Sequence, residues 1–277
     1  MDKKSLIMEK AIDLFAENGI ETTSVQQITE RCGISKGAFY LYFKSKDELI
    51  LSLIDHFMSS FITRIEQSVS KEVNGNQLYR FLHELFSQLK QHVHFAKIFM
   101  KEPVFTVKKE YVERVQFYSQ SINQLLFNLL KKQFPDIQPF KYDDLLFSVN
   151  GFVKSYMDLF FQDHYPVDIN LLCDSIIEKT TLIAEYAKIP FISPDSFVKR
   201  ERRELSIRKE QLIAILKEGI QKSKEDPLIA ETFKLLMENL ENPQLNVVII
   251  QGLLNTLRTK DSYRWISYLY DAYIKTI

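Results

Sequence analysis

Apolar residues recur every three or four positions along most of the chain, which is the spacing of one face of an α-helix. The first such stripe ends just before Gly19, a favourable helix stop, and consists of Leu6, Ile7, Ala11, Leu14 and Phe15. Glycine and proline are scarce, at 7 and 8 residues, whereas 45% of the residues are hydrophobic. We therefore predict an all-α protein with a substantial helical core.

Capping residues predict further short helices within the first fifty residues. Ser24 followed by Gln27 is a capping box, so a helix begins at Val25, and Gly33 provides the positive φ of a tight turn. Ser35 caps a third helix, expected over 36–42, and a second capping box at 45–48 begins a fourth helix. Two short helices joined by a glycine turn are typical of a helix-turn-helix, here at residues 24–43.

The charge pattern adds a narrow positive region to this motif. The whole chain is neutral, with 36 Lys and Arg against 36 Asp and Glu, but residues 31–46 contain no acid and four basic residues, Arg31, Lys36, Lys44 and Lys46. Basic side chains there can contact DNA phosphates. A three-helix core with aromatic packing and no DNA binding is the alternative that caps and spacing leave open.

A family resemblance favours DNA binding. Residues 11–19, 23–28 and 32–49 resemble the signature of the tetracycline-repressor (TetR) family, including the run Cys32-Gly-Ile-Ser-Lys-Gly-Ala-Phe-Tyr-Leu-Tyr-Phe-Lys-Ser-Lys-Asp-Glu-Leu49. The resemblance covers nearly all of residues 5–50 without a gap. It implies a DNA-binding domain over 1–61 and DNA contacts by Ser24, Ser35, Lys36, Gly37, Ala38, Tyr40, Tyr42 and Lys46.

Aromatic residues are concentrated in the middle of the chain. Residues 81–165 hold 18 of the 35 aromatic residues. Most can simply fill a helical core, but the excess also suggests a ring-lined cavity for an apolar or aromatic ligand. In the resembled family this region holds the inducer pocket, so we expect a ligand-binding and dimerisation domain over 62–188, with the pocket lined by Phe95, Phe99, Phe117, Tyr118, Phe147 and Tyr156.

Two further helices are expected at the end of this domain. The stretch 142–164 is apolar on two sides, and Ile169, Leu172, Ile176 and Ile183 mark the next stripe. A helix that is apolar on two sides must bury both of them. In the resembled family the corresponding pair packs against its two-fold mate, which implies a homodimer on a palindromic DNA operator.

A helical C-terminal region is expected over 195–277, after a linker at 189–195. A mixed-charge helix start at 199–204 and a final apolar stripe from Tyr263 to Ile277 support this. Asp226-Pro227 and Asn242-Pro243 are each expected to place proline in the first turn of a helix. The region either packs on the ligand domain or widens the dimer interface.

Several classes of function are not supported by the residues present. The histidines His92 and His94 are two apart and would diverge on a helix, and Cys32 and Cys173 are isolated, so we expect no metal site, no cofactor and no enzyme activity. No apolar run reaches the ~18 residues of a membrane span and no signal peptide is evident, so a cytoplasmic location is expected.

These patterns leave two functional hypotheses. The first is a dimeric repressor released from its operator by an apolar or aromatic small molecule. The alternative is a DNA-binding regulator controlled by a protein partner through the C-terminal region, without small-molecule induction.

Overall fold

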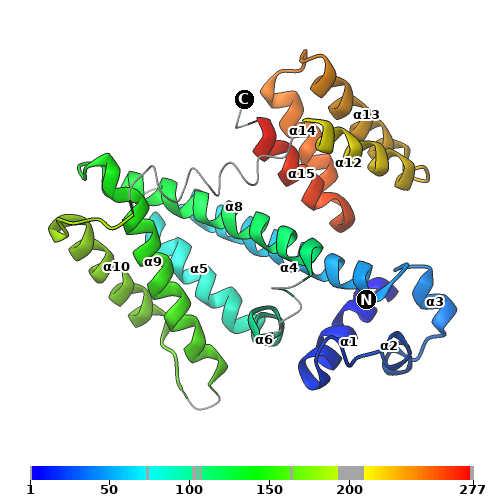
Figure 1. The fold of residues 1–277 in the computed structure, drawn as a ribbon, viewed down its shortest axis with the longest axis horizontal. Coiled ribbons are helices and arrows are strands. Elements are labelled where there is room, and N and C mark those ends of the chain that lie inside the picture. Colours follow the sequence, from blue (N-terminus) through cyan, green and yellow to red (C-terminus); the bar gives the residue numbers. More distant parts are fainter. Residues whose placement is uncertain are drawn as a thin grey trace. The chain divides into compact units, whose positions relative to one another are not determined.

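The computed structural model describes residues 2–72, 75–101, 105, 108–162, 165–192 and 209–274. Within these ranges the chain forms helices joined by turns and no strand (Figure 1), which confirms the predicted all-α class. The helices are α1 Lys3–Asn18, α2 Val25–Cys32, α3 Lys36–Tyr40, α4 Lys46–Ser70, α5 Gln77–Gln91, α6 Val93–Lys101, α8 Lys109–Gln133, the 3-10 helix η1 Pro139–Lys141, α9 Tyr142–Met157, the 3-10 helix η2 Asp158–Phe161, α10 Ile169–Tyr186, α12 Lys209–Lys222, α13 Pro227–Glu241, α14 Val247–Arg258 and α15 Asp261–Ile274.

The chain divides into two compact units, Met1–Val198 and Lys199–Ile277. Within the first unit, α1–α3 lie at one end and α9 and α10 at the other, with α4 and α8 extending between them (Figure 1). Helix α4 continues unbroken through residues 61 and 62. The division into 1–61, 62–188 and 195–277 therefore stays a prediction, and the expected helix start at 199–204 lies outside the described residues.

The core of the first unit is built mainly from α4, α5, α8, α9 and α10. Its fully buried members come from these helices and include Ile65, Phe81, Phe86, Leu130, Val149 and Ile176. The expected helix over 142–164 is wrong in its extent, because α9 ends at Met157 and tightens into a 3-10 turn. Phe160 in that turn stacks on Phe86 at 5.7 Å between ring centroids, so the turn still contributes to the core.

The second unit has its own core between α12, α13, α14 and α15. Leu216, Phe233 and Leu254 are completely buried there. Helices α12 and α13 approach closely at Gly219, where an added Cβ would lie 2.8 Å from the ring of Phe233. Glycine at that position therefore sets the distance between the two helices.

One proline prediction is right and the other is wrong. Asp226 caps α13, which begins at Pro227. Pro243, by contrast, lies in the turn before α14, whose cap is Asn246. The side chain of Asn239 accepts hydrogen bonds from the amides of Gln244 and Leu245 at 3.1 and 2.9 Å. Those bonds tie the segment after Pro243 back to α13, and α14 begins only at Val247.

Candidate nucleic-acid interface

The turn between α2 and α3 follows from local backbone geometry. The Ser24 hydroxyl accepts a hydrogen bond from the Gln27 amide at 3.2 Å, and the Gln27 side chain accepts one from the Ser24 amide at 2.7 Å. Gly33 then ends α2 with φ +65°, a left-handed conformation that favours glycine. The predicted capping box and glycine turn are both confirmed.

Helix α3 buries one aromatic face and exposes the other. Phe39 is completely buried and its ring lies 5.8 Å from that of Phe43. Tyr40 and Tyr42 are exposed, at 46% and 38%. The helix ends at Tyr40, two residues earlier than expected, because the chain tightens into a turn in which the Tyr42 amide bonds the Phe39 carbonyl. Both tyrosine hydroxyls therefore remain accessible to phosphate or a base edge.

Most of the residues expected to contact DNA lie on the exposed side of this motif. Ser24, Ser35, Lys36, Gly37, Tyr40 and Tyr42 are exposed, and Ala38 is half-buried. The Ser35 hydroxyl caps α3 by accepting from the Ala38 amide at 3.2 Å. Their contacts with DNA stay predictions, but the structure brings all seven to the two helices of the motif.

Lys46 has a different environment from the other seven residues. Its ammonium donates to the carbonyl oxygens of Ile20 and Thr23 at 2.9 and 3.0 Å, and to that of Glu21 at 3.4 Å. These bonds join the first turn of α4 to the turn between α1 and α2. Lys46 thus positions the DNA-binding domain on α4, and its phosphate contact stays a prediction.

The positive region is narrower in the structure than in the sequence. Arg31 is paired with Glu17 at 2.9 Å, and this hydrogen bond holds the pKa of the Glu17 carboxyl below its ordinary value. Lys36 and Lys44 are exposed and have no ion-pair partner among the residues that the structure describes. These two lysines are therefore the cations most available for phosphate.

Leu41 is a residue that the sequence reasoning missed. Its side chain is 84% exposed between the two exposed tyrosines. An apolar side chain in the major groove can contact the methyl group of thymine. The sequence did contain a clue to this exposure. Leu41 lies two residues after the predicted core residue Phe39, at the end of a short helix, so the two side chains point in different directions.

A series of stacked and tilted aromatic rings, which we call the ring stack, lies next to the DNA-binding domain. Phe57 of α4 stacks on Phe95 of α6 with 4.1 Å between centroids, and Phe95 lies 5.5 Å from Phe99. The series continues through Phe105 to Tyr111 of α8, at 5.0 and 5.8 Å. Helix α6 also packs against α1. The ring stack thus joins three helices next to the DNA-binding domain.

Two polar links connect α4 to α8 beside the ring stack. Asp47, in the first turn of α4, accepts a hydrogen bond from the Tyr111 hydroxyl and pairs with Lys108, both at 2.6 Å. The bonds from Lys108 and Tyr111 hold the pKa of Asp47 below its ordinary value. Deeper in the unit, Asp55 pairs with Arg114 and accepts from the Tyr118 hydroxyl at 2.9 Å.

The six residues expected to line a ligand cavity do not converge at one place. Phe95 and Phe99 belong to the ring stack, whereas Phe117 and Tyr118 are buried neighbours on α8. Tyr156 is half-buried against the core of the unit. Phe147 is 58% exposed on α9, a position that fits a subunit interface better than an interior cavity. Phe57, which sequence reasoning missed, stacks closely on Phe95.

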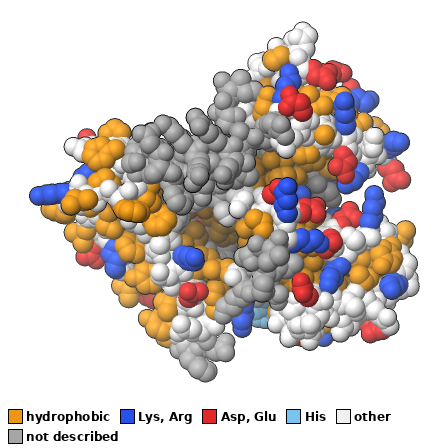
Figure 2. Space-filling model, in the orientation of Figure 1, with side chains coloured by type: hydrophobic (Ala, Val, Ile, Leu, Met, Phe, Trp, Pro, Cys, Tyr) orange, Lys and Arg blue, Asp and Glu red, His pale blue; other side chains and the backbone are white. Residues whose placement is uncertain are grey.

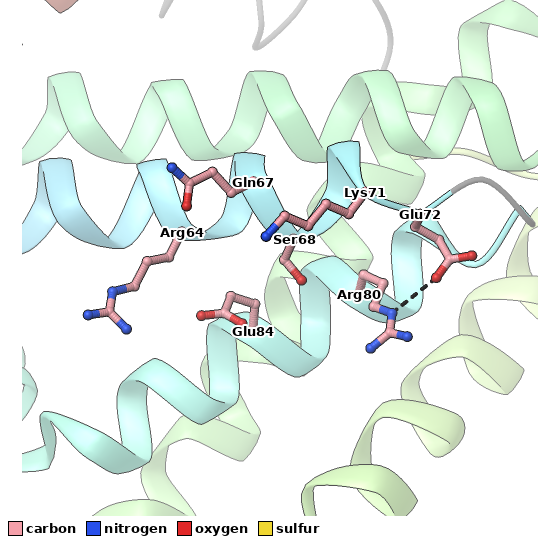
Figure 3. A pocket seen from close by; sticks show the side chains of 7 residues that line it. All are labelled: Arg64, Gln67, Ser68, Lys71, Glu72, Arg80 and Glu84. Atoms are coloured by element: carbon pink, nitrogen blue, oxygen red, sulfur yellow. Dashed lines mark hydrogen bonds and ion pairs between the residues drawn. The ribbon is translucent and has the colours of Figure 1, made fainter.

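A polar pocket lies on the surface between α4 and α5 (Figure 3). Its lining consists of Arg64, Gln67, Ser68, Lys71, Glu72, Arg80 and Glu84. No group of His, Cys, Asp and Glu among the described residues is arranged to hold a metal ion. Likewise, none of the described helices is both long enough and apolar enough to cross a membrane.

Comparisons with known proteins agree with this arrangement. Residues 7–53 match the family described as bacterial regulatory proteins, tetR family. The uncharacterized HTH-type transcriptional regulator YerO of Bacillus subtilis is 27% identical over 268 residues, which cover 92% of this chain and 90% of that protein.

Two solved structures share the fold of the first unit. The fatty acid degradation regulator FadR from Bacillus halodurans matches with a TM-score of 0.57 and 19% identity, covering 68% of this chain and 97% of that one. FadR from Bacillus subtilis, in complex with stearoyl-CoA, matches with a TM-score of 0.56 and 20% identity, covering 65% and 97%.

The capped α2, the exposed face of α3 and the all-helical scaffold define a helix-turn-helix DNA-binding transcriptional regulator. Residues 7–53 form a TetR-family N-terminal domain, and the chain as a whole is similar to the HTH-type transcriptional regulator YerO. Proteins of this family are regulators and not enzymes, in agreement with the sequence prediction.

Proposed function

We propose that the protein is a dimeric repressor, released from a palindromic operator by a small molecule with an apolar part. The observation that carries this proposal is the ring stack. It leads from Phe57 through Phe95 and Phe99 to Tyr111, whose hydroxyl bonds Asp47 at the start of α4. An apolar ligand against these rings would therefore contact the helices that support the DNA-binding domain.

The coupling of ligand to DNA rests on differential affinity. A ligand shifts the balance between two states only by as much as it prefers one of them. Contacts of the ligand with Phe95 and Phe99 would move α6, which packs against α1. If the moved state holds the two recognition helices at the wrong spacing, ligand and DNA oppose each other reciprocally.

The apolar outer face of α9 and α10 supports a homodimer. Figure 2 shows apolar side chains gathered over this part of the first unit, at the left of the view. Four large ones are more than half exposed, Phe147 of α9 and Leu171, Leu182 and Tyr186 of α10. Large exposed apolar patches mark interaction surfaces. A two-fold dimer would present recognition helices to major grooves about 34–36 Å apart.

An amphipathic acyl compound is the effector class that we favour. Stacked phenylalanines offer an apolar surface for a hydrocarbon chain. The similar FadR of Bacillus subtilis forms a complex with stearoyl-CoA. We carry that ligand class to this chain as a proposal only.

The proposal is tested with purified protein and DNA from around its own gene. Fluorescence anisotropy should detect sequence-selective binding at moderate salt and its loss when stearoyl-CoA is added. Phe99→Ala should retain DNA binding but respond less to the ligand. Absence of selective DNA binding, or release that is unchanged in Phe99→Ala, contradicts the proposal.

The alternative function is regulation by a protein partner that binds the second unit, and two observations favour it. Val247 and Val248 at the start of α14 are 66% and 80% exposed, and the similar FadR structures match only 68% and 65% of this chain. Thermal-shift screening separates the two functions. Strong stabilisation by apolar compounds favours the repressor, whereas none, together with capture of a partner that needs Val248, favours the alternative.

A further inference from the structure

The pocket between α4 and α5 has a volume of about 430 Å³. Ser68 of α4, Lys71 at the C-terminal cap of α4 and Glu84 of α5 line the middle of the pocket, with Arg64 at one end and the Arg80–Glu72 pair at the other (Figure 3). Three of the seven lining residues are cations and two are acids. The pocket is therefore charged throughout and offers little to an apolar molecule.

The acids of the pocket are already engaged, whereas two of its cations are not. Glu72 pairs with Arg80 at 3.1 Å, and Glu84 accepts a hydrogen bond from Gln88 at 2.9 Å. Arg64 and Lys71 have no hydrogen-bond or ion-pair partner within the described part of the chain. Two cations are thus available for an anion from outside the protein.

The spacing of these cations indicates what kind of anion fits. Arg64 lies on α4 and Lys71 is its C-terminal cap, seven residues later, so their Cα atoms are about 10 Å apart along the helix axis. A molecule with several phosphate oxygens can accept hydrogen bonds from both cations at once. Guanidinium groups bind phosphate through two parallel hydrogen bonds, and ammonium groups bind it as point charges.

The face of α4 that lines the pocket continues toward the ring stack. Phe57, Phe61, Arg64, Ser68 and Lys71 follow one another at intervals of three or four residues, so they share one face of α4. At the aromatic end, His92 packs edge-on against Phe57 at 5.5 Å. Burial, and then the charge of Arg64, lowers the pKa of His92.

We propose that the pocket between α4 and α5 binds the phosphorylated head group of an amphipathic effector whose apolar part lies against the ring stack. The identity of the effector in this inference rests on the proposed function. The pocket would be a second binding site beside the ring stack, with Arg64 and Lys71 as the phosphate ligands. Glu84 opposes the anion and limits its affinity.

The test compares four versions of the full chain by isothermal titration with three probes. The proteins are the wild type, the double variant Arg64→Gln/Lys71→Gln, the single variant Glu84→Gln and the control Lys90→Gln, which changes an exposed α5 lysine outside the pocket. The probes are coenzyme A without an acyl chain, stearate and inorganic pyrophosphate. Thermal melting checks that all variants are folded.

Charge-assisted hydrogen bonds set the expected size of the effects. The double variant should bind coenzyme A at least about tenfold more weakly than the wild type, since it loses two such contacts. Glu84→Gln should bind it more tightly, Lys90→Gln should match the wild type, and pyrophosphate should compete with coenzyme A. Stearate should bind all four proteins equally.

The inference is overturned if coenzyme A and pyrophosphate do not bind the wild type, or bind the double variant equally well. That result is distinct from failure of the proposed function. If coenzyme A binds as expected but stearoyl-CoA does not release DNA, the pocket stands and the repressor mechanism fails. If stearate releases DNA but coenzyme A does not bind, the opposite holds.

Discussion

Single lysines near the DNA-binding motif have separate roles that their charge alone does not reveal. Lys36 is exposed at the start of α3, whereas Lys46 donates to carbonyl oxygens of the turn between α1 and α2. Both belong to the same acid-free stretch of sequence. The structure, and not the charge, therefore distinguishes Lys36, which is available for DNA, from Lys46, which links α4 to the turn between α1 and α2.

Replacement of Lys36 by alanine tests the exposed role. We expect operator affinity to fall about tenfold at low salt, because one charge-assisted contact is lost. The slope of log affinity against log salt should decrease by about one unit. Anisotropy titrations at several salt concentrations measure both, and thermal melting should be unchanged. An unchanged salt slope would mean that Lys36 does not face DNA.

The buried pair between Asp55 and Arg114 has a mainly structural role. Asp55 is 5% exposed, and the Arg114 side chain is 14% exposed. We expect Arg114→Met to lower the free energy of unfolding by about 3–5 kcal/mol, because Asp55 is left buried without its charge partner. Lys109→Met, at a side chain that is 88% exposed, is the matched control. Urea denaturation that gives equal losses for both variants would exclude this role.

At the scale of helices, local backbone chemistry accounts for most of the DNA-binding motif. Capping serines at positions 24, 35 and 45 each accept from the amide three residues later. Each bond satisfies an amide that the first turn of a helix leaves without a partner. The starts of α2, α3 and α4 could therefore be predicted from sequence.

The two glycines of the motif should respond to substitution in opposite directions. Gly33 has φ +65°, so Gly33→Ala should destabilise the protein by about 1–2 kcal/mol. Gly37 lies within α3 and an added Cβ would meet only the Ser35 hydroxyl, at 3.9 Å. Gly37→Ala should therefore stabilise by about 0.5–1 kcal/mol. Thermal denaturation measures both, and the same sign for the two would contradict the turn geometry.

At the scale of the whole molecule, two units with separate cores divide the chain. The second unit buries Leu216, Phe233 and Leu254 among its own four helices. The similar FadR structures cover 68% and 65% of the chain, close to the extent of the first unit. The family match at residues 7–53 lies within the first unit, so we predict that this unit binds DNA without the second.

Removal of the second unit tests this division. A chain that ends at Val198 should unfold cooperatively and bind the operator with affinity similar to that of the full chain, because α1–α10 keep their own core. Circular dichroism and anisotropy measure the two properties. A folded fragment that no longer binds the operator would show that DNA recognition needs the second unit.

Predictions from sequence failed where contacts between distant segments decide the outcome. Asn242-Pro243 looks like a helix start, yet Asn239 holds the following amides in a turn. Phe147, which was expected to line the pocket, lies exposed on α9, and the stacking of Phe57 on Phe95 had no sign in the sequence. The spacing of apolar residues predicts which face of a helix is buried, but it does not predict which other helix packs against that face.

The sequence by itself determined the all-helical class, the capped helix starts, the glycine turn and the TetR-type motif. The capped helix starts and the glycine turn depend on hydrogen bonds and dihedral angles that span only a few residues, whereas the helical class follows from apolar spacing and the TetR-type motif from its resemblance to the family signature. The tertiary structure alone decided the binding of Lys46 to the turn between α1 and α2, the ring stack and the Asp55–Arg114 link. Each of these joins residues on separate helices, so its formation depends on how the helices pack.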